Sequence, residues 1–154
     1  MITGPNGKAV TRKAAFSRET GVSVNIEADA SIIWALLTNA TDFPRWNSTV
    51  ISISGRIQSG EIIELRSTLD EKRTFKLKIK EFVPNQRLVW SDPMGSRVYI
   101  LEKAGKGTQF TMSEKIGGPL FPLFASMIPS FDESFEKFAA DLKKEAETIQ
   151  RSKN

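Results

Sequence analysis

The stretch RTFKLKIKEFV, residues 73–83, has the strictest alternation in the chain. Phe75, Leu77 and Ile79 alternate with lysines, which predicts a β-strand with one apolar face and one charged face. The apolar face needs another element to cover it. The charged row, called the lysine ladder below, consists of Lys76, Lys78 and Lys80.

Shorter strands surround this one and are separated by turn residues. They are expected at residues 20–26, 50–57, 62–69, 88–91, 97–102 and 109–115. Close spacing and short Gly-, Pro-, Asn- or Asp-containing turns predict an antiparallel meander. Two short helices are expected after the first strand, with Asp29 capping the first and Pro44 in the opening turn of the second.

The C-terminal region predicts one long amphipathic helix. Its apolar stripe consists of Phe131, Phe135, Phe138, Leu142 and Ala146. Pro129 predicts a break just before it, and Ser130 with Glu133 matches a capping box that restarts the helix. About 20 helical residues span about 30 Å, enough to cross a small domain. The sequence therefore predicts an α+β fold in which a curved sheet of about seven strands wraps this helix around an apolar cavity.

Composition excludes several kinds of chemistry. The 154 residues contain no cysteine and no histidine. Disulfides, thiolate nucleophiles, histidine acid/base catalysis and most zinc sites are therefore excluded. We expect no cofactor and no bound metal. The absence of cysteine fits a cytoplasmic location, and residues 1–20 lack the apolar run of a signal peptide.

Two segments resemble a known superfamily. WALLT at residues 34–38, followed by DFPRWN at 42–47, is similar to a signature of the START-like (SRPBCC, helix-grip) superfamily in its polyketide cyclase/dehydrase-like branch. NQRLVW at residues 85–90 is similar to a later strand of that branch. The resemblance spans about residues 22–149. Ser48 departs from it, because the signature usually has proline there.

The resemblance implies a cavity without naming a reaction, because a fold alone does not settle function. We expect the cavity to bind a small, largely hydrophobic ligand: a lipid, an isoprenoid or an aromatic polyketide. One alternative is a cofactor-independent polyketide cyclase or dehydratase. A second is a protein-interaction domain, similar to co-chaperones of this fold, that docks through the lysine ladder.

Candidate ligand contacts lie on the sheet, on the long helix and on the second short helix. They are Trp46, Arg66, Leu77, Ile79, Trp90, Ile100, Met112, Phe131, Phe135, Phe138 and Leu142. The alternative for the helix stripe is ordinary core packing, and the alternative for Trp46 is that it is a structural plug. The candidates for catalysis are Glu114, as acid or base, and Tyr99, as hydrogen-bond donor. Alternatively, both side chains, and that of Glu64, lie on the solvent-exposed face of the sheet.

The expected organisation is one domain. Residues 1–17 form a flexible lead-in, 18–150 the helix-grip domain and 151–154 a tail. The net charge of +4 lies largely near the two ends, and we expect these charges to be solvated and no nucleic acid to bind. No transmembrane segment is expected, but the apolar residues 120–128 suit a mobile lid or transient contact with a membrane surface. We expect a monomer or a weak homodimer.

Overall fold

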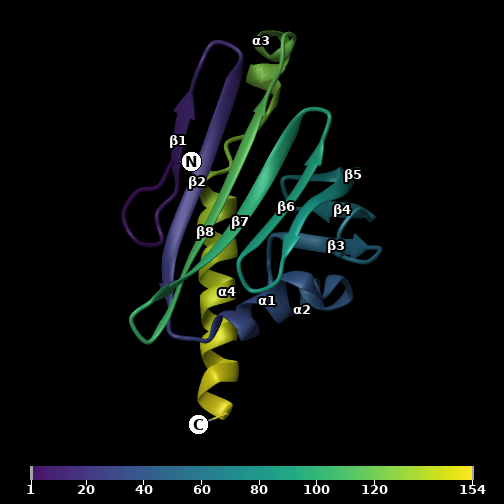
Figure 1. The fold of residues 1–154 in the computed structure, drawn as a ribbon. Helices are drawn as coiled ribbons and strands as arrows, with labels where there is room; N and C mark the ends of the chain where they lie inside the picture. Colours follow the sequence, from purple (N-terminus) through teal and green to yellow (C-terminus); the bar gives the residue numbers. More distant parts are fainter. Residues whose placement is uncertain (1, 154) are drawn as a thin grey trace.

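The computed structural model describes residues 2–153. Its elements are β1 (Val10–Lys13), β2 (Ser17–Ile26), α1 (Ala30–Thr38), η1 (Ala40–Asp42), α2 (Phe43–Trp46), β3 (Val50–Ser54), β4 (Ile62–Ser67), β5 (Asp70–Val83), β6 (Arg87–Asp92), β7 (Gly95–Ala104), β8 (Gly107–Gly117), α3 (Phe121–Phe124), η2 (Ala125–Met127) and α4 (Asp132–Ser152). The predicted α+β fold is confirmed: α4 crosses one face of a curved antiparallel sheet, with α1 and α2 near one end and α3 at the other (Figure 1).

The sheet has eight strands in the order β1-β2-β8-β7-β6-β5-β4-β3. It is a meander from β3 to β8, and β2 then closes onto β8 over ten residue pairs, from Ser17↔Gly117 to Ile26↔Thr108. The extra strand is β1, which pairs with β2. The expectation of a flexible lead-in is therefore wrong for Val10–Lys13, and α4 runs two residues further than expected. Met1 and Asn154 lie outside the described residues.

A local signal accounts for the start of α1. The Asp29 side chain accepts a hydrogen bond from Ser31 N at 2.8 Å, as an N-cap should. The break before α4 is confirmed. The capping box is not formed, because Phe131 occupies the N-cap position and the Ser130 hydroxyl accepts only from Asp132 N.

The interior is built on the stripe of α4. Phe135, Phe138, Leu142 and Ala146 are all buried against the sheet. The outer face of β5 carries the exposed lysine ladder, so the alternation at residues 73–83 is confirmed.

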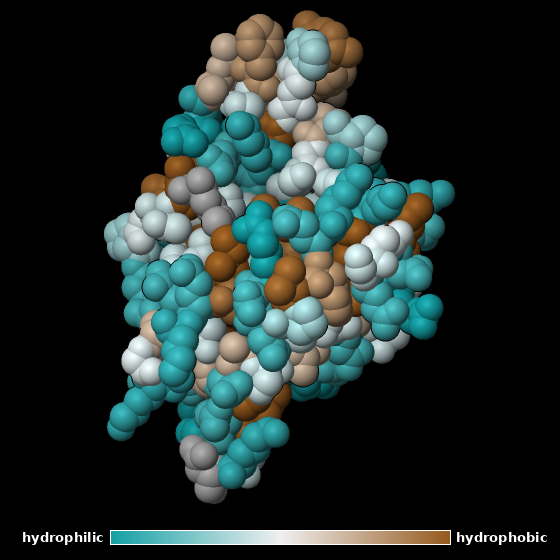
Figure 2. Space-filling view, viewed as in Figure 1, coloured by the Kyte–Doolittle hydropathy of each residue, from teal (hydrophilic) through white to brown (hydrophobic). Residues whose placement is uncertain are grey.

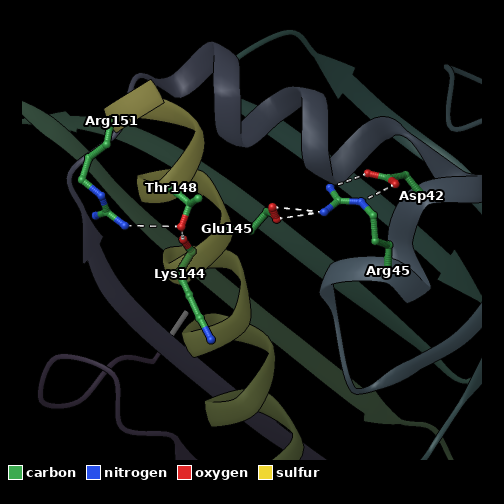
Figure 3. Close-up of polar contacts among 6 residues, drawn as sticks. All are labelled: Asp42, Arg45, Lys144, Glu145, Thr148 and Arg151. Carbon is green, nitrogen blue, oxygen red and sulfur yellow. Dashed lines mark hydrogen bonds and ion pairs between the residues drawn. The ribbon is translucent and has the colours of Figure 1, made fainter. Parts of the chain in front are cut away.

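A polar clamp joins the α2 region to α4. The guanidinium of Arg45 donates to both carboxylate oxygens of Asp42, at 2.8 and 3.0 Å, and to Glu145 at 3.1 Å (Figure 3). Because the Arg45 side chain is 55% exposed, water screens these bonds and they add little to stability. Their contribution is orientation, since they hold the second short helix beside the middle of α4. Further along α4, the Thr148 hydroxyl donates a hydrogen bond to the Lys144 carbonyl and accepts one from the Arg151 guanidinium.

Candidate functional site

A cavity of about 200 Å³ opens at the end of the sheet where α3 lies. Strands β4 to β8 form one side of it, and the connection from η2 to α4 forms the other. Its apolar lining consists of Leu65, Leu69, Phe75, Leu77, Trp90, Met94, Ile116, Met127, Ile128, Pro129 and Phe131. The polar and small lining residues are Ser67, Asp70, Arg73, Asp92, Gly95, Ser96, Arg97 and Glu114. A largely apolar lining with a few polar groups is the usual composition of a small-molecule site.

One ion pair stands on the inner wall. Arg97 on β7 lies directly opposite Glu114 on β8, and Arg97 Nε donates to Glu114 Oε1 at 2.7 Å. Their side chains are only 12% and 17% exposed. Burial alone would lower the pKa of Arg97, but the Glu114 carboxylate and the Tyr99 hydroxyl outweigh it and raise that pKa above its ordinary value. Arg97 therefore presents a fixed positive charge to the cavity.

Aromatic rings support Arg97 from below. Its guanidinium carbon lies 5.0 Å from the centre of the Phe135 ring, a cation–π distance. Phe135 in turn stacks on Phe131, which lines the cavity. The start of α4 therefore fixes both the floor of the cavity and the position of its main charged donor.

Tyr99 lies behind this wall and is outside the lining. It is fully buried, and its hydroxyl meets Arg97 Nη1 at 3.5 Å, the limit of a hydrogen bond. Burial raises the pKa of Tyr99 to about 12, and Arg97 only partly opposes this. The ring packs edge-on against Trp90, with centroids 5.1 Å apart. Tyr99 thus supports Arg97 and Trp90 but does not reach the cavity.

Packed rings fill the space further along α4. Phe138 contacts four other aromatic rings at centroid distances of 5.8–6.3 Å: Phe43, Trp46, Tyr99 and Phe110. Trp46 also packs on Phe43 at 4.8 Å. These five rings, called the aromatic plug, pack between sheet and helix, and none of them lines the cavity.

The predicted site residues therefore fall into three groups. Leu77, Trp90, Glu114 and Phe131 line the cavity. Buried in the core outside the lining are Trp46, Ile79, Tyr99, Met112, Phe135, Phe138 and Leu142. The expected inward direction is wrong for Arg66 and Ile100, which lie on the other face of the sheet, and Glu64 lies on that wet face too, the alternative that the sequence left open.

Strand parity explains the direction of all three side chains. Glu64 and Arg66 alternate with the buried Ile63 and Leu65, and the Arg66 guanidinium donates to the Glu71 carbonyl on the outside. Ile100 follows the buried Tyr99, and neighbouring strand residues point to opposite faces.

Two arginines were missed by reasoning from the sequence alone. Arg97 is two residues before Tyr99 and so shares its face, a signal the alternation of the strand contains. Arg18 is 92% buried on β2 and donates to the carbonyls of Ile128 and Pro129, at 3.2 and 2.7 Å. Its guanidinium also lies 5.0 Å from the Phe131 ring centre. Arg18 therefore ties the connection before α4, which forms one side of the cavity, to the sheet.

Among residues 2–153, no three acidic side chains are grouped so that they could hold a metal ion. No helix in the same part of the chain is long and apolar enough to cross a bilayer.

Residues 17–147 match the model of the family described as polyketide cyclase / dehydrase and lipid transport. The chain belongs to this family. Its fold is START-like, as the resemblance implied. A search of curated proteins found no match to this chain.

Solved structures agree on the fold. A START superfamily protein from Mycobacterium smegmatis has a TM-score of 0.62 at 15% identity, with 85% of this chain and 98% of that chain covered. DynU16, a protein in the dynemicin biosynthetic locus, has a TM-score of 0.64 at 18% identity, over 87% of this chain and 49% of that chain. The Aha1 dimer from Colwellia psychrerythraea has a TM-score of 0.60 at 17% identity, over 88% and 98%. At these identities the likeness shows the fold alone.

Proposed function

We propose that this family member binds a small, largely apolar molecule in the cavity and holds one polar group of it with Arg97 and Glu114. The observation that carries the proposal is the ion pair on the wall of an otherwise apolar cavity. One Glu114 oxygen accepts from Arg97 Nε, and no bond from Arg97 Nη2 or the other Glu114 oxygen is seen in residues 2–153. A hydroxyl both donates and accepts, so it suits this pair of free groups.

The volume limits the ligand. At about 200 Å³ the cavity is smaller than the roughly 300–1,000 Å³ of most ligand pockets. A single ring, or a short branched chain, suits this space. For a lipid, an isoprenoid or an aromatic polyketide, the remainder of the molecule would extend through the mouth.

Ligand-dependent thermal stabilisation tests the proposal. Native mass spectrometry of detergent-free protein, followed by organic extraction, identifies what co-purifies. A panel of hydroxylated lipids, isoprenoids and phenols is then screened by melting temperature. In Ile116→Phe the larger ring fills the cavity, so stabilisation should be lost. The control Ile100→Phe adds the same bulk on the opposite face and should keep it. Equal stabilisation of both variants would contradict a site in this cavity.

Catalysis is the second candidate, and one observation favours it: Glu114 lines the cavity. The proposal is a cofactor-independent cyclase or dehydratase in which Glu114 moves a proton and the cavity orients the reacting chain. Tyr99 has no direct part in it, because its buried hydroxyl contacts Arg97 and the residue is outside the cavity lining. Unchanged turnover of a phenolic polyketide by Glu114→Gln would exclude this mechanism.

Partner docking through the lysine ladder is a third proposal. A shallow groove beside the ladder contains the exposed Ile62 together with Pro93. Reversing the charge at Lys76, Lys78 and Lys80 should abolish any such binding in a pull-down, whereas cavity variants should leave it intact. A monomer or weak homodimer, a cytoplasmic location and no nucleic-acid partner remain predictions from the sequence.

A further inference from the structure

The exposed apolar side chains are concentrated at one end of the molecule. Of the eight large hydrophobic side chains that are exposed in residues 2–153, six lie there. Figure 2 shows brown side chains gathered at the end where Figure 1 places α3. This group, called the apolar tip, consists of Phe16, Met94, Leu120, Leu123, Phe124 and Met127.

Backbone hydrogen bonds make the apolar tip one continuous surface. Gly117 N donates to the Met94 carbonyl and Gly118 N to the Phe16 carbonyl, both at 3.0 Å. These bonds join the β1–β2 turn, the β6–β7 turn and the start of the α3 segment. The buried Phe121 anchors that segment from inside, and Arg18 holds its far end. The exposed side chains are thus presented together on a held backbone.

The apolar tip also borders the cavity on one side. Met94 and Met127 belong to both the tip and the cavity lining, and Ile128 and Pro129 complete that edge. An apolar surface beside an apolar cavity suits an apolar phase as its partner, because a ligand could then pass between the two with little exposure to water.

Composition favours a lipid surface over another protein. Residues 116–131 contain no charged side chain, in a chain that is 26% charged. Specific protein interfaces carry about one hydrogen bond per 100–200 Å², and this segment offers only Ser126 and Ser130 for side-chain bonds. Insertion between lipid headgroups requires no such directed bonds.

Charges around the tip add to this. Lys13, Arg73 and Lys115 are exposed just behind it. The nearby carboxylates are Glu19, which lies opposite Lys115 across β2 and β8, Asp70, Asp92, and Asp132 and Glu133 in the first turn of α4. Asp92 accepts from the backbone N–H groups of its own turn. With a net charge of +4, the chain is attracted to anionic headgroups.

We propose that the apolar tip docks on an anionic lipid bilayer, with the mouth of the cavity facing the acyl chains. This surface lies outside the polar wall that would hold a ligand, and docking does not require the cavity to be filled. The two proposals can therefore fail separately.

Flotation with vesicles tests the docking. The full chain should float with vesicles of 70% phosphatidylcholine and 30% phosphatidylglycerol, and less with phosphatidylcholine alone. Leu123→Gln with Met127→Gln removes the two most exposed tip side chains, at 70% and 77%, and should weaken vesicle binding about tenfold or more. The matched control is Ile62→Gln, which is 61% exposed on β4 and should bind like the parent chain.

A site-specific probe identifies the occupant. Because the chain has no cysteine, Leu123→Cys and Ile62→Cys each accept a single environment-sensitive dye. Anionic vesicles should shift the emission to the blue at position 123 and not at position 62. Failure to float, flotation retained by the double variant, or a shift at position 123 that rises with protein concentration without vesicles would each overturn the proposal. The last result would show a second copy on this surface.

Discussion

Arg97 and Glu114 face each other across β7 and β8, and Arg97 Nε donates to Glu114 Oε1 at 2.7 Å. Because the pair is mostly buried, removing one partner leaves the other as a buried charge without its counter-ion. We expect Glu114→Leu to lower the free energy of unfolding by about 3 kcal/mol, since it leaves a buried guanidinium unpaired. Urea denaturation would measure this.

The double variant provides the control for that experiment. Replacing a buried pair with apolar residues is often neutral. Arg97→Leu with Glu114→Leu should therefore unfold within about 1 kcal/mol of the parent. Strictly additive losses would show that the two side chains act independently.

Tyr99 provides a pH-dependent prediction. Its pKa is raised from 10.0 to about 12 in the folded chain, so folding favours the neutral phenol. This contribution to stability is fully present below pH 10 and is lost as the pH rises from 10 towards 12. Tyr99 is the only tyrosine, so tyrosinate absorbance reports on it alone. At pH 10.5 the folded chain should show little tyrosinate absorbance, and the urea-unfolded chain should show much more. Equal absorbance in both states would contradict the burial.

Phe138 should be the most costly side chain of the aromatic plug to remove. Phe138→Ala deletes a ring that contacts four others, and we expect a loss of about 3–5 kcal/mol in the free energy of unfolding. Phe124→Ala removes the same ring from the exposed tip and should change stability by less than about 1 kcal/mol. Chemical denaturation of both variants compares them directly, and similar losses would be inconsistent with the plug.

Arg18 should control the mobility of the segment before α4. Arg18→Met leaves the carbonyls of Ile128 and Pro129 without their donors, and the free energy of unfolding should fall by about 1–2 kcal/mol. Amide hydrogen exchange in residues 120–128 should accelerate more than in β7. The control is Arg12→Met, whose side chain is 67% exposed and pairs with Glu19, and it should leave that exchange unchanged. Uniform acceleration over the whole chain would instead indicate global destabilisation.

Much of this fold could be predicted from sequence because each element has its own periodic signal. The alternation at residues 73–83 and the stripe from Phe131 predict a strand and a helix independently of context. The signal for β1 was weaker: Val10–Lys13 has four residues and is only partly buried.

The site was harder to predict because it depends on register and on the packing of distant residues. Tyr99 and Ile100 are both candidate site residues, yet two neighbouring residues of a strand point to opposite faces of the sheet. Counting back along the β7–β8 hairpin from Gly105 and Lys106 places Arg97 opposite Glu114, so this pair was within reach. The extent of the aromatic plug was not, because it depends on how rings from four separate elements fit together.

The pairing of β2 with β8 has a consequence for how the chain is made. Ser23 and Thr111, which share a hydrogen bond in this pairing, are 88 residues apart in sequence. A ribosome releases β2 long before β8 exists, so the edge of β2 that faces away from β1 waits with unpaired backbone groups while the meander assembles. Closing such a long loop is a slow step for any chain. Translation speed and chaperone access during that interval should therefore affect the yield of this protein.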